Sequence, residues 1–125
     1  MSQRKTIFIS GATAGIGQAT AWEFAKNDYN LILTGRRGER LANLKKELET
    51  KYGVNVLTLV MDVRNQEEVQ SSIEMLPEEW TTVDILVNNA GLALGREPIQ
   101  SGNLEDWENM LDTNVKGLLY LTKAI

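Results

Sequence analysis

Short apolar runs recur along the chain at residues 5–10, 31–33, 54–60 and 83–87. The first run is apolar from Ile7 to Ile9, and the other runs contain few polar residues. Continuous runs of this length are typical of strands that are covered on both faces, as in a parallel sheet. The pattern therefore predicts four strands that form the buried centre of the molecule.

The stretches between these runs carry apolar side chains at helical spacing. The predicted helices run from about Gly15 to Asn27, from about Arg40 to Gly53, from about Gln66 to Leu76, and from about Leu104 to the end. The side chains predicted to face inward are Ile16, Ala19, Thr20, Trp22 and Phe24 in the first helix, Leu41, Leu44 and Leu48 in the second, Val69, Ile73 and Leu76 in the third, and Leu104, Trp107, Leu111, Val115, Leu118, Leu119 and Ile125 in the last.

Strand and helix alternate four times, and this alternation sets the expected fold class. It implies right-handed β-α-β units and a parallel sheet with helices on both faces. The predicted fold is therefore α/β, the N-terminal part of a Rossmann-type doubly wound parallel sheet, with strand order 3-2-1-4. Because no linker or low-complexity segment interrupts the pattern, we expect residues 1–125 to form one domain. Its fourth strand would be an open edge, so we expect marginal stability or self-association.

Composition excludes several classes of function. The net charge of −4, without a basic stripe, argues against nucleic-acid binding. No apolar run approaches the roughly 20 residues of a membrane span. The chain has neither cysteine nor histidine, which excludes disulfides, thiolate catalysis, a Ser-His-Asp triad and Cys or His metal sites. The N-terminal residues lead directly into the first strand, so we expect no signal peptide and a cytoplasmic location.

The segment between the first strand and the first helix is rich in glycine. Glycines would let the backbone approach an anion closely, and the first N–H groups of a helix lack intrahelical partners. A purely structural turn is the plainer alternative. The position at the first strand–helix junction favours the pyrophosphate of a dinucleotide. The residues assigned to this role are Ser10, Gly11, Thr13, Ala14, Gly15, Ile16 and Gly17.

The end of the second strand carries arginines where an NAD-binding protein would place an acid. The sequence there is Thr-Gly-Arg-Arg at residues 34–37, so no carboxylate is available to bond a ribose 2′-hydroxyl. The guanidinium groups of Arg36 and Arg37 would instead pair with the 2′-phosphate of NADP. Arg40, one helical turn further on, would reinforce them. Exposed arginines that merely open a solvated helix are the alternative, but the position favours NADP as cofactor.

Two more polar groups follow the third and fourth strands. The Asp62 carboxylate would accept a hydrogen bond from the adenine amino group, with Val63 against the ring, although an aspartate after a strand also serves as a turn residue. Asn-Asn-Ala-Gly at residues 88–91 follows the fourth strand, at the predicted switch point where ligands bind. Its amides would tie neighbouring loops together, and its small residues would leave room for a cofactor. The residues assigned from this turn are Asn89, Ala90 and Gly91.

Asn114 lies inside the predicted last helix, three residues before Gly117. Such a pair weakens a helix. Asn114 is either an ordinary polar position beside a close-packed glycine, or an amide that interrupts helical bonding in order to hold a water molecule. Spacing alone does not separate these interpretations.

Taken together, these segments resemble the short-chain dehydrogenase/reductase family. Ser10 stands where the family usually has threonine, and it keeps the hydroxyl group. Ala14 stands where NADP-dependent members often have a basic residue, so NADP binding would rest on Arg36 and Arg37. The matching segments occur in the family's order and cover nearly the whole chain: residues 10–17, 62–63, 88–91, and Asn114 with Gly117.

Within the family, residues 35–41, 62–65, 76–80 and 89–98 are similar to the NADP-dependent serine or 3-hydroxy acid dehydrogenases. This resemblance implies hydride transfer between NADP(H) and the hydroxyl or carbonyl group of a small 3-hydroxy acid, such as serine or allo-threonine, or of a semialdehyde. It also implies that Asn114 belongs to the catalytic set and that the enzyme is a homo-oligomer, either a dimer or a tetramer.

The family's chemistry also uses a serine on a fifth strand and a Tyr-x-x-x-Lys pair. This chain contains neither, because Tyr120 has its lysine three residues on, at Lys123. We therefore expect the N-terminal part of a longer enzyme, truncated before these groups, that binds cofactor weakly and does not catalyse by itself.

The alternative is a non-catalytic dinucleotide-binding or interaction module. A methyltransferase is less favoured, since it would need an acid after the second strand. A coding sequence that continues past Ile125 with the serine and the Tyr-x-x-x-Lys pair would favour the enzyme, and a stop codon there would favour the module.

Overall fold

The computed structural model describes residues 4–13, 15–89, 104–105 and 118–125, and it contains a four-stranded parallel sheet within these ranges. The strand order is β3-β2-β1-β4, which confirms the predicted order. The strands are β1 (Thr6–Ile9), β2 (Asn30–Gly35), β3 (Val56–Val60) and β4 (Ile85–Val87).

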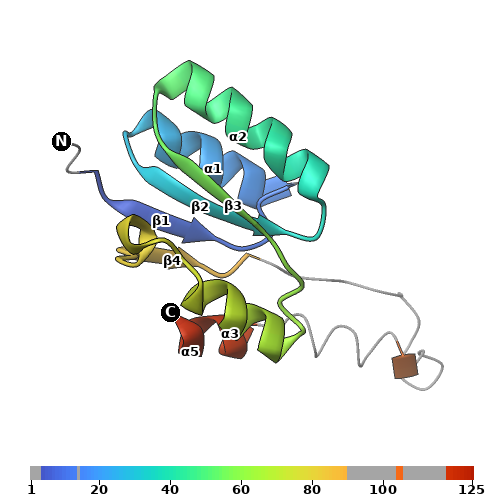
Figure 1. Cartoon of the computed structure of the whole chain (residues 1–125). Coiled ribbons are helices and arrows are strands. Elements are labelled where there is room, and N and C mark those ends of the chain that lie inside the picture. The colour runs from blue at the N-terminus through green and yellow to red at the C-terminus, as the bar shows by residue number, and fades with distance from the viewer. Residues whose placement is uncertain (1–3, 14, 90–103, 106–117) are drawn as a thin grey trace.

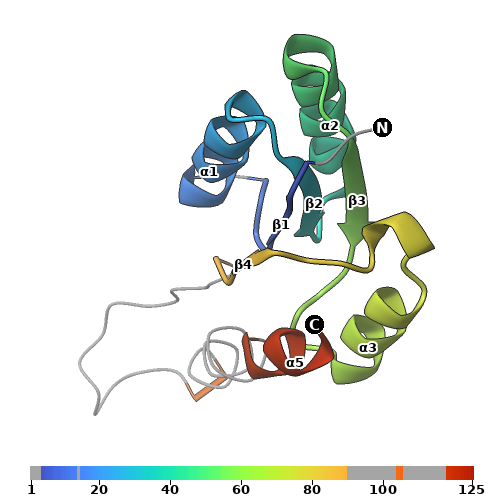
Figure 2. The same cartoon turned by 90° about the vertical axis from the view of Figure 1, so that its left-hand side faces the viewer.

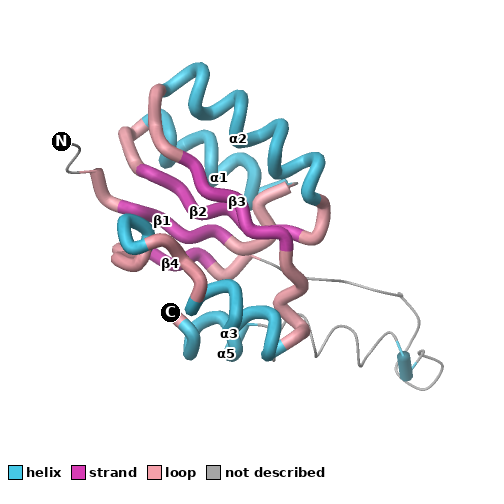
Figure 3. Tube along the Cα trace, in the orientation of Figure 1, coloured by secondary structure: helices cyan, strands magenta, loops and turns pink. Residues whose placement is uncertain are grey.

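Helices cover both faces of this sheet (Figures 1 and 2). The helices α1 (Gly15–Lys26) and α2 (Gly38–Tyr52) lie on one face, and α3 (Gln66–Glu74) and α5 (Leu118–Ala124) lie on the other. The 3-10 turn η1 (Glu78–Trp80) connects α3 to the strand β4. Figure 3 shows how each helix of the first three strand–helix units returns the chain to the start of the next parallel strand. Among the described residues, no helix has the length and apolar character required to span a membrane.

The two faces of the sheet hold two separate hydrophobic clusters. Along β1, Ile7 and Ile9 pack toward α1 and α2, whereas Phe8 packs toward α3 and α5. The strand β2 repeats this division, with Leu31 and Leu33 on one side and Ile32 on the other. Because successive strand side chains alternate between faces, a sheet covered on both sides needs a continuous apolar run. This arrangement explains the runs in the sequence.

The buried face of α1 confirms the prediction for Trp22 and Phe24, which are partly buried against the core, and differs from it elsewhere. Its buried residues are Gly17, Ala21 and Ala25, four residues apart, whereas Ile16 is 77% exposed. Small residues on this face let the helix backbone approach the sheet closely. The prediction for Ile16 was wrong because it assumed that the larger apolar side chains face the core. Ile16 lies at the start of α1, beside the glycine-rich loop, and its side chain is available to a ligand.

The other helices confirm part of the predicted packing. Leu41, Leu44 and Leu48 are buried in α2, which ends at Gly53 with a left-handed backbone (φ 68°). Among the α5 side chains that the structure describes, Leu121 is buried, which the prediction omitted, while Leu119 is 58% exposed. Leu104 is also exposed. The predicted inward positions Trp107, Leu111 and Val115 lie outside the described residues.

Candidate cofactor site at the carboxyl ends of the strands

The loops that follow the strands meet at one edge of the sheet and are bonded to one another through their backbones. The Ser10 amide donates to the Val87 carbonyl oxygen at 3.0 Å, which joins the end of β1 to the end of β4. The Ala12 amide donates to the Thr34 carbonyl oxygen at 3.0 Å, so the loop after β1 is also hydrogen-bonded to β2. Parallel strands place all their carboxyl ends on the same edge, where ligands of such sheets bind.

Side chains of the first and fourth loops strengthen this connection. The Ser10 Oγ accepts a hydrogen bond from the Asn89 amide at 3.0 Å and donates to the Val87 carbonyl oxygen at 3.4 Å. The Asn89 Nδ2 donates to the Gly11 carbonyl oxygen at 3.0 Å. The structure therefore shows the predicted tie between neighbouring loops, and it gives the Ser10 hydroxyl a bridging role that threonine could also perform.

We expect Ser10→Ala to lower the free energy of unfolding by about 1 kcal/mol, because the part-buried Asn89 backbone amide loses one of its two acceptors and keeps only the Val87 carbonyl oxygen at 3.1 Å. Ser10→Thr keeps the hydroxyl and should stay within about 0.5 kcal/mol of the wild type. Urea unfolding of the three proteins measures both differences. Equal losses in the two variants would show that the hydroxyl bridge contributes nothing.

The glycine-rich loop forms a cradle of bare backbone at the start of α1. Gly11 and Gly15 adopt left-handed conformations, with φ of 65° and 58°. A side chain at Gly17 would collide with the Gly11 carbonyl oxygen and would lie 2.5 Å from the Asn89 Nδ2. At Gly15 an added Cβ would meet nothing within 4 Å. Open space therefore lies beside the first N–H groups of α1, which have no partners within the helix, and a pyrophosphate fits this arrangement.

Cationic side chains stand at the neighbouring strand end. Arg36 and Arg37 follow β2, are exposed, and make no ion pair with any described residue. Arg37 is the N-cap of α2 and supplies no side-chain hydrogen bond to that helix, so the first amides of α2 also lack a side-chain partner. Arg40 lines a hollow of about 260 Å³ together with Thr13 of the loop. These groups offer charge and donors to a phosphate beside the first loop.

The Asp62 carboxylate stands after β3 and is paired with Arg64. The Arg64 Nη2 lies 2.6 Å from the Asp62 Oδ2. These side-chain hydrogen bonds hold the pKa of Asp62 below its usual value, against the raising effect of burial. The Arg64 backbone amide and the charges of Arg64 and Arg36 lower the pKa further. Arg36 and Asp62 are therefore electrostatic neighbours, which places the ends of β2 and β3 in a common site.

This lowered pKa makes stability depend on pH. The unfolded chain binds a proton at Asp62 more readily than the folded chain, so the pair stabilises the fold above about pH 4 and is lost as pH falls through the folded pKa. We expect Asp62→Asn to cost about 1 kcal/mol at pH 7, and the difference from the wild type to shrink below pH 4. Urea unfolding at pH 7 and pH 3 measures this. Glu79→Gln, which removes an exposed carboxylate of η1, is the control. A loss of unfolding free energy in Asp62→Asn that is the same at pH 7 and pH 3 would contradict the assignment.

Most of the predicted cofactor residues lie at this strand edge. Val63 is only 7% exposed and belongs to the hydrophobic core cluster beneath α3 and α5, so the predicted contact of its side chain with an adenine ring is not supported by its burial. Asn88 donates to the Thr122 Oγ1 at 3.2 Å and connects the end of β4 to α5. The predicted site residues Ala14, Ala90, Gly91 and Asn114 lie outside the described residues.

The prediction from sequence missed Arg64. Its signal in the sequence is an aspartate two residues earlier, because the Asp62 Oδ1 accepts from the Arg64 amide at 3.0 Å in an Asx turn. It also missed Glu68, whose Oε1 accepts from the Asp62 amide at 3.1 Å. Both contacts fix the turn that carries the Asp62 carboxylate.

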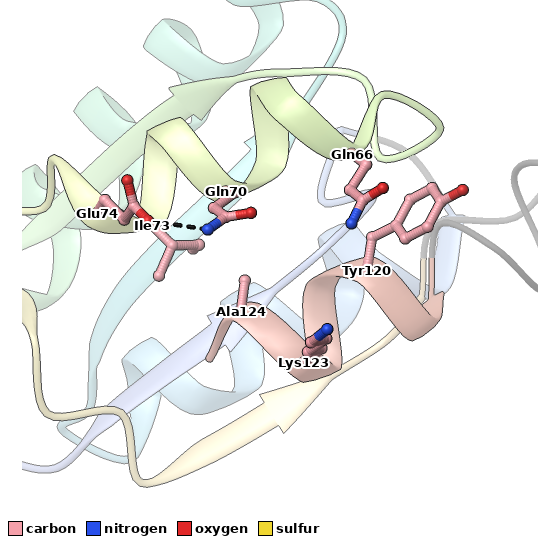
Figure 4. A pocket seen from close by; sticks show the side chains of 7 residues that line it. All are labelled: Gln66, Gln70, Ile73, Glu74, Tyr120, Lys123 and Ala124. Carbon is pink, nitrogen blue, oxygen red and sulfur yellow. Dashed lines mark hydrogen bonds between the residues drawn. The ribbon is translucent and has the colours of Figure 1, made fainter.

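A second hollow, of about 230 Å³, lies between α3 and α5 (Figure 4). Gln70 donates to Glu74 at 3.0 Å along one wall, and Tyr120 and Lys123 belong to the other wall. None of the predicted cofactor-binding residues that the structure describes lines this hollow. It is therefore a different place from the strand-end site.

The fold and the strand-end loops together define a class of protein. A parallel sheet in the order 3-2-1-4, with helices on both faces and a glycine-rich turn between β1 and α1, is a Rossmann-type α/β structure. A family model described as short chain dehydrogenase matches residues 5–125. The chain belongs to the short-chain dehydrogenase family.

Its relatives include proteins with different stated activities. The NADP-dependent 3-hydroxy acid dehydrogenase YdfG of Salmonella typhi is 50% identical over 119 residues, which are 95% of this chain and 46% of the relative. Sulfoacetaldehyde reductase 2 of Chromohalobacter salexigens is 51% identical over 119 residues, with the same coverage. The crystal structure of serine dehydrogenase from Escherichia coli is similar with a TM-score of 0.88 at 48% identity, and the match covers 95% of this chain and 53% of that one. The chain spans about half the length of the curated relatives it matches.

Proposed function

We propose that the chain binds NADP(H) at the strand-end site. One observation carries this proposal: the end of β2 presents two arginines without ion-pair partners among the described residues, at the sheet edge where the glycine-rich loop opens α1. A carboxylate at that place would favour NAD, whereas paired guanidinium groups favour a 2′-phosphate. The stated NADP dependence of the Salmonella typhi relative supports the same cofactor.

Each part of the cofactor has its own group of residues in this proposal. The backbone of the Ser10–Gly17 loop and the N-terminus of α1 hold the pyrophosphate, with Ile16 as an exposed apolar contact. Arg36 and Arg37 hold the 2′-phosphate. Asp62 accepts a hydrogen bond from the adenine amino group, and the turn that begins at Asn89 borders the nicotinamide half. The Asn89 side chain keeps the loop in shape through the Gly11 carbonyl oxygen.

We further propose that these residues serve an oxidoreductase acting on a small acid that carries a hydroxyl or an aldehyde group. The nicotinamide ring, when bound, supplies or accepts the hydride. The chain's own contribution is to bind and orient the cofactor, with Asn114 as its member of the catalytic set. The names of the relatives, a 3-hydroxy acid dehydrogenase and a sulfoacetaldehyde reductase at nearly equal identity, support the class of substrate and do not choose one.

The 125 residues by themselves form a cofactor-binding domain in this proposal. Their three tyrosines do not include a Tyr-x-x-x-Lys pair, so we expect weak cofactor binding and no turnover by this chain alone. A cytoplasmic location and homo-oligomeric assembly as a dimer or tetramer remain predictions. The alternative, a non-catalytic dinucleotide-binding module, shares the same site and the same cofactor.

Cofactor binding by the 125-residue chain is the direct test. NADPH and NADH differ only in the 2′-phosphate, and energy transfer from the chain's three tryptophans to the reduced nicotinamide reports binding. We expect NADPH to bind at least tenfold more tightly than NADH, and the difference to shrink as salt rises. Equal affinities would exclude the 2′-phosphate assignment, and no binding of either nucleotide would exclude the site.

A further inference from the structure

Among the described residues, one side chain, that of Arg64, pairs with the Asp62 carboxylate. The Arg64 Nε lies 3.0 Å from Oδ1 and 3.1 Å from Oδ2, and the Arg64 Nη2 lies 2.6 Å from Oδ2. The Arg64 backbone amide adds a bond to Oδ1 at 3.0 Å. A planar guanidinium that forks onto both oxygens of a carboxylate fixes its direction as well as its charge.

Other residues hold the backbone of the same turn independently of this fork. The Asp62 amide donates to the Glu68 Oε1 at 3.1 Å, and the Asn65 amide donates to the Asp62 carbonyl oxygen at 3.0 Å. The Asn65 Oδ1 in turn accepts from the Glu68 amide at 3.0 Å and caps α3. Because these bonds position the main chain, the guanidinium of Arg64 governs chiefly where the Asp62 carboxylate points.

The donors that the described residues supply leave the Asp62 carboxylate about one acceptor position for another group. A carboxylate offers about four acceptor positions on its two oxygens. The Oδ1 receives two donors, the backbone amide and Nε of Arg64, whereas the Oδ2 has Nη2 as its close donor and shares Nε. The Asp62 side chain is 28% exposed, so part of it is accessible to an incoming group.

We propose that Arg64 is a positioning residue that aims this carboxylate at the 6-amino group of the cofactor's adenine, and that it thereby makes the site reject 6-oxopurine dinucleotides. The proposal rests on the proposed function. A fixed, ionised carboxylate only accepts hydrogen bonds, so it matches an amino donor and repels a carbonyl oxygen at the same position. A site built for one hydrogen bond discriminates strongly against an analogue that lacks the partner. Hydrogen bonding from Arg64 also keeps the pKa of Asp62 low, which maintains the acceptor in its ionised form.

The test compares NADP with its hypoxanthine analogue, which carries a carbonyl oxygen in place of the amino group. Dissociation constants of both nucleotides are measured by calorimetry for the 125-residue chain and for Arg64→Ala, Arg64→Lys, Asp62→Ala and the double variant Arg64→Ala with Asp62→Ala. We expect the wild type to prefer NADP roughly tenfold. Arg64→Ala should weaken NADP roughly fivefold and leave the analogue within about twofold, and Arg64→Lys, which keeps the charge without the fork, should fall between. In the Asp62→Ala background the Arg64→Ala change should no longer alter the preference.

Several outcomes would overturn the proposal. Equal weakening of both nucleotides by Arg64→Ala would mean that Arg64 only supports the turn, and a change of preference that persists without the Asp62 carboxylate would mean that it acts by another route. Circular dichroism checks that each variant is folded. If Arg64→Ala does not fold, the comparison of the wild type with Arg64→Lys still tests the proposal. A wild type that binds NADP without any preference defeats this inference alone, whereas a wild type that binds neither nucleotide defeats the proposed function with it.

Discussion

Replacing Arg36 and Arg37 together by alanine is expected to weaken NADP binding roughly 100-fold, while NAD binding stays within about twofold. Each guanidinium offers charge-assisted hydrogen bonds, which contribute about 1.5–3 kcal/mol when they are made to a charged partner. A combined loss of about 3 kcal/mol corresponds to roughly two orders of magnitude in the dissociation constant. NAD lacks the 2′-phosphate and so has little to lose. Calorimetric titration of both nucleotides measures the two effects on one protein preparation.

A matched control variant removes the same amount of positive charge from a different part of the surface. Lys26→Ala with Lys46→Ala deletes two exposed cations from α1 and α2 and lowers the net charge equally. We expect this variant to keep NADP binding within about twofold, apart from a small loss of long-range attraction that salt removes. If the control weakens NADP as much as the arginine variant does, or if the arginine variant weakens both nucleotides alike, the arginines do not read the 2′-phosphate.

Gly17→Ala is expected to lower the free energy of unfolding by about 3 kcal/mol and to weaken NADP binding at least tenfold. The new methyl group would collide with the Gly11 carbonyl oxygen and the Asn89 Nδ2, which are themselves hydrogen-bonded to each other. Overpacking of a tight site costs about 1–3 kcal/mol, and breaking a part-buried hydrogen bond costs about 1 kcal/mol more. Because backbone rather than a flexible side chain stands in the way, the loop has to change shape.

Gly38→Ala serves as the matched substitution for this experiment. It places the same methyl group in the first turn of α2, where the nearest neighbour is the Val60 Cγ2 at 3.1 Å. Val60 is 58% exposed and its side chain can turn aside, so we expect a change in the free energy of unfolding within about 1 kcal/mol and a much smaller loss of NADP affinity than Gly17→Ala causes. Urea unfolding and nucleotide titration of the pair measure both quantities. Similar losses in the two variants would show that the Gly11–Asn89 contact is not what Gly17 protects.

Much of the fold was predictable because its main signal is periodic. The continuous runs around Ile7–Ile9 and Leu31–Leu33 identify strands covered on both faces, and the spacing of leucines in residues 41–48 identifies the buried face of α2. The strand order followed from the strand–helix alternation, which implies right-handed β-α-β units, together with the strand order of a doubly wound Rossmann-type sheet. The periodic spacing of apolar residues in the sequence thus predicts which residues are buried when those residues are large and apolar.

The prediction from sequence was wrong where contact depends on small residues or on individual geometry. The buried face of α1 is built from Gly17, Ala21 and Ala25, whose low hydrophobicity gives a weak signal, and so Ile16 was placed inside although it is exposed. The fork of Arg64 onto Asp62 depends on the conformation of the turn after β3, which the pattern of residue types does not determine. The loops of the candidate site were predictable as motifs, and so was a tie between them through the amides after β4, whereas the individual partners, such as the Ser10 hydroxyl and the Asn89 backbone amide, were not.

Amide chemical shifts of the 15N-labelled chain during NADP titration test most directly where the nucleotide binds on the chain. We predict that the largest shifts occur at residues 11–17, at Arg36 and Arg37, and at residues 62–64, and that NAD titration leaves Arg36 and Arg37 nearly unmoved. Shifts concentrated on the walls of the hollow between α3 and α5, such as Gln70 and Lys123, or no shifts at all, would contradict the account.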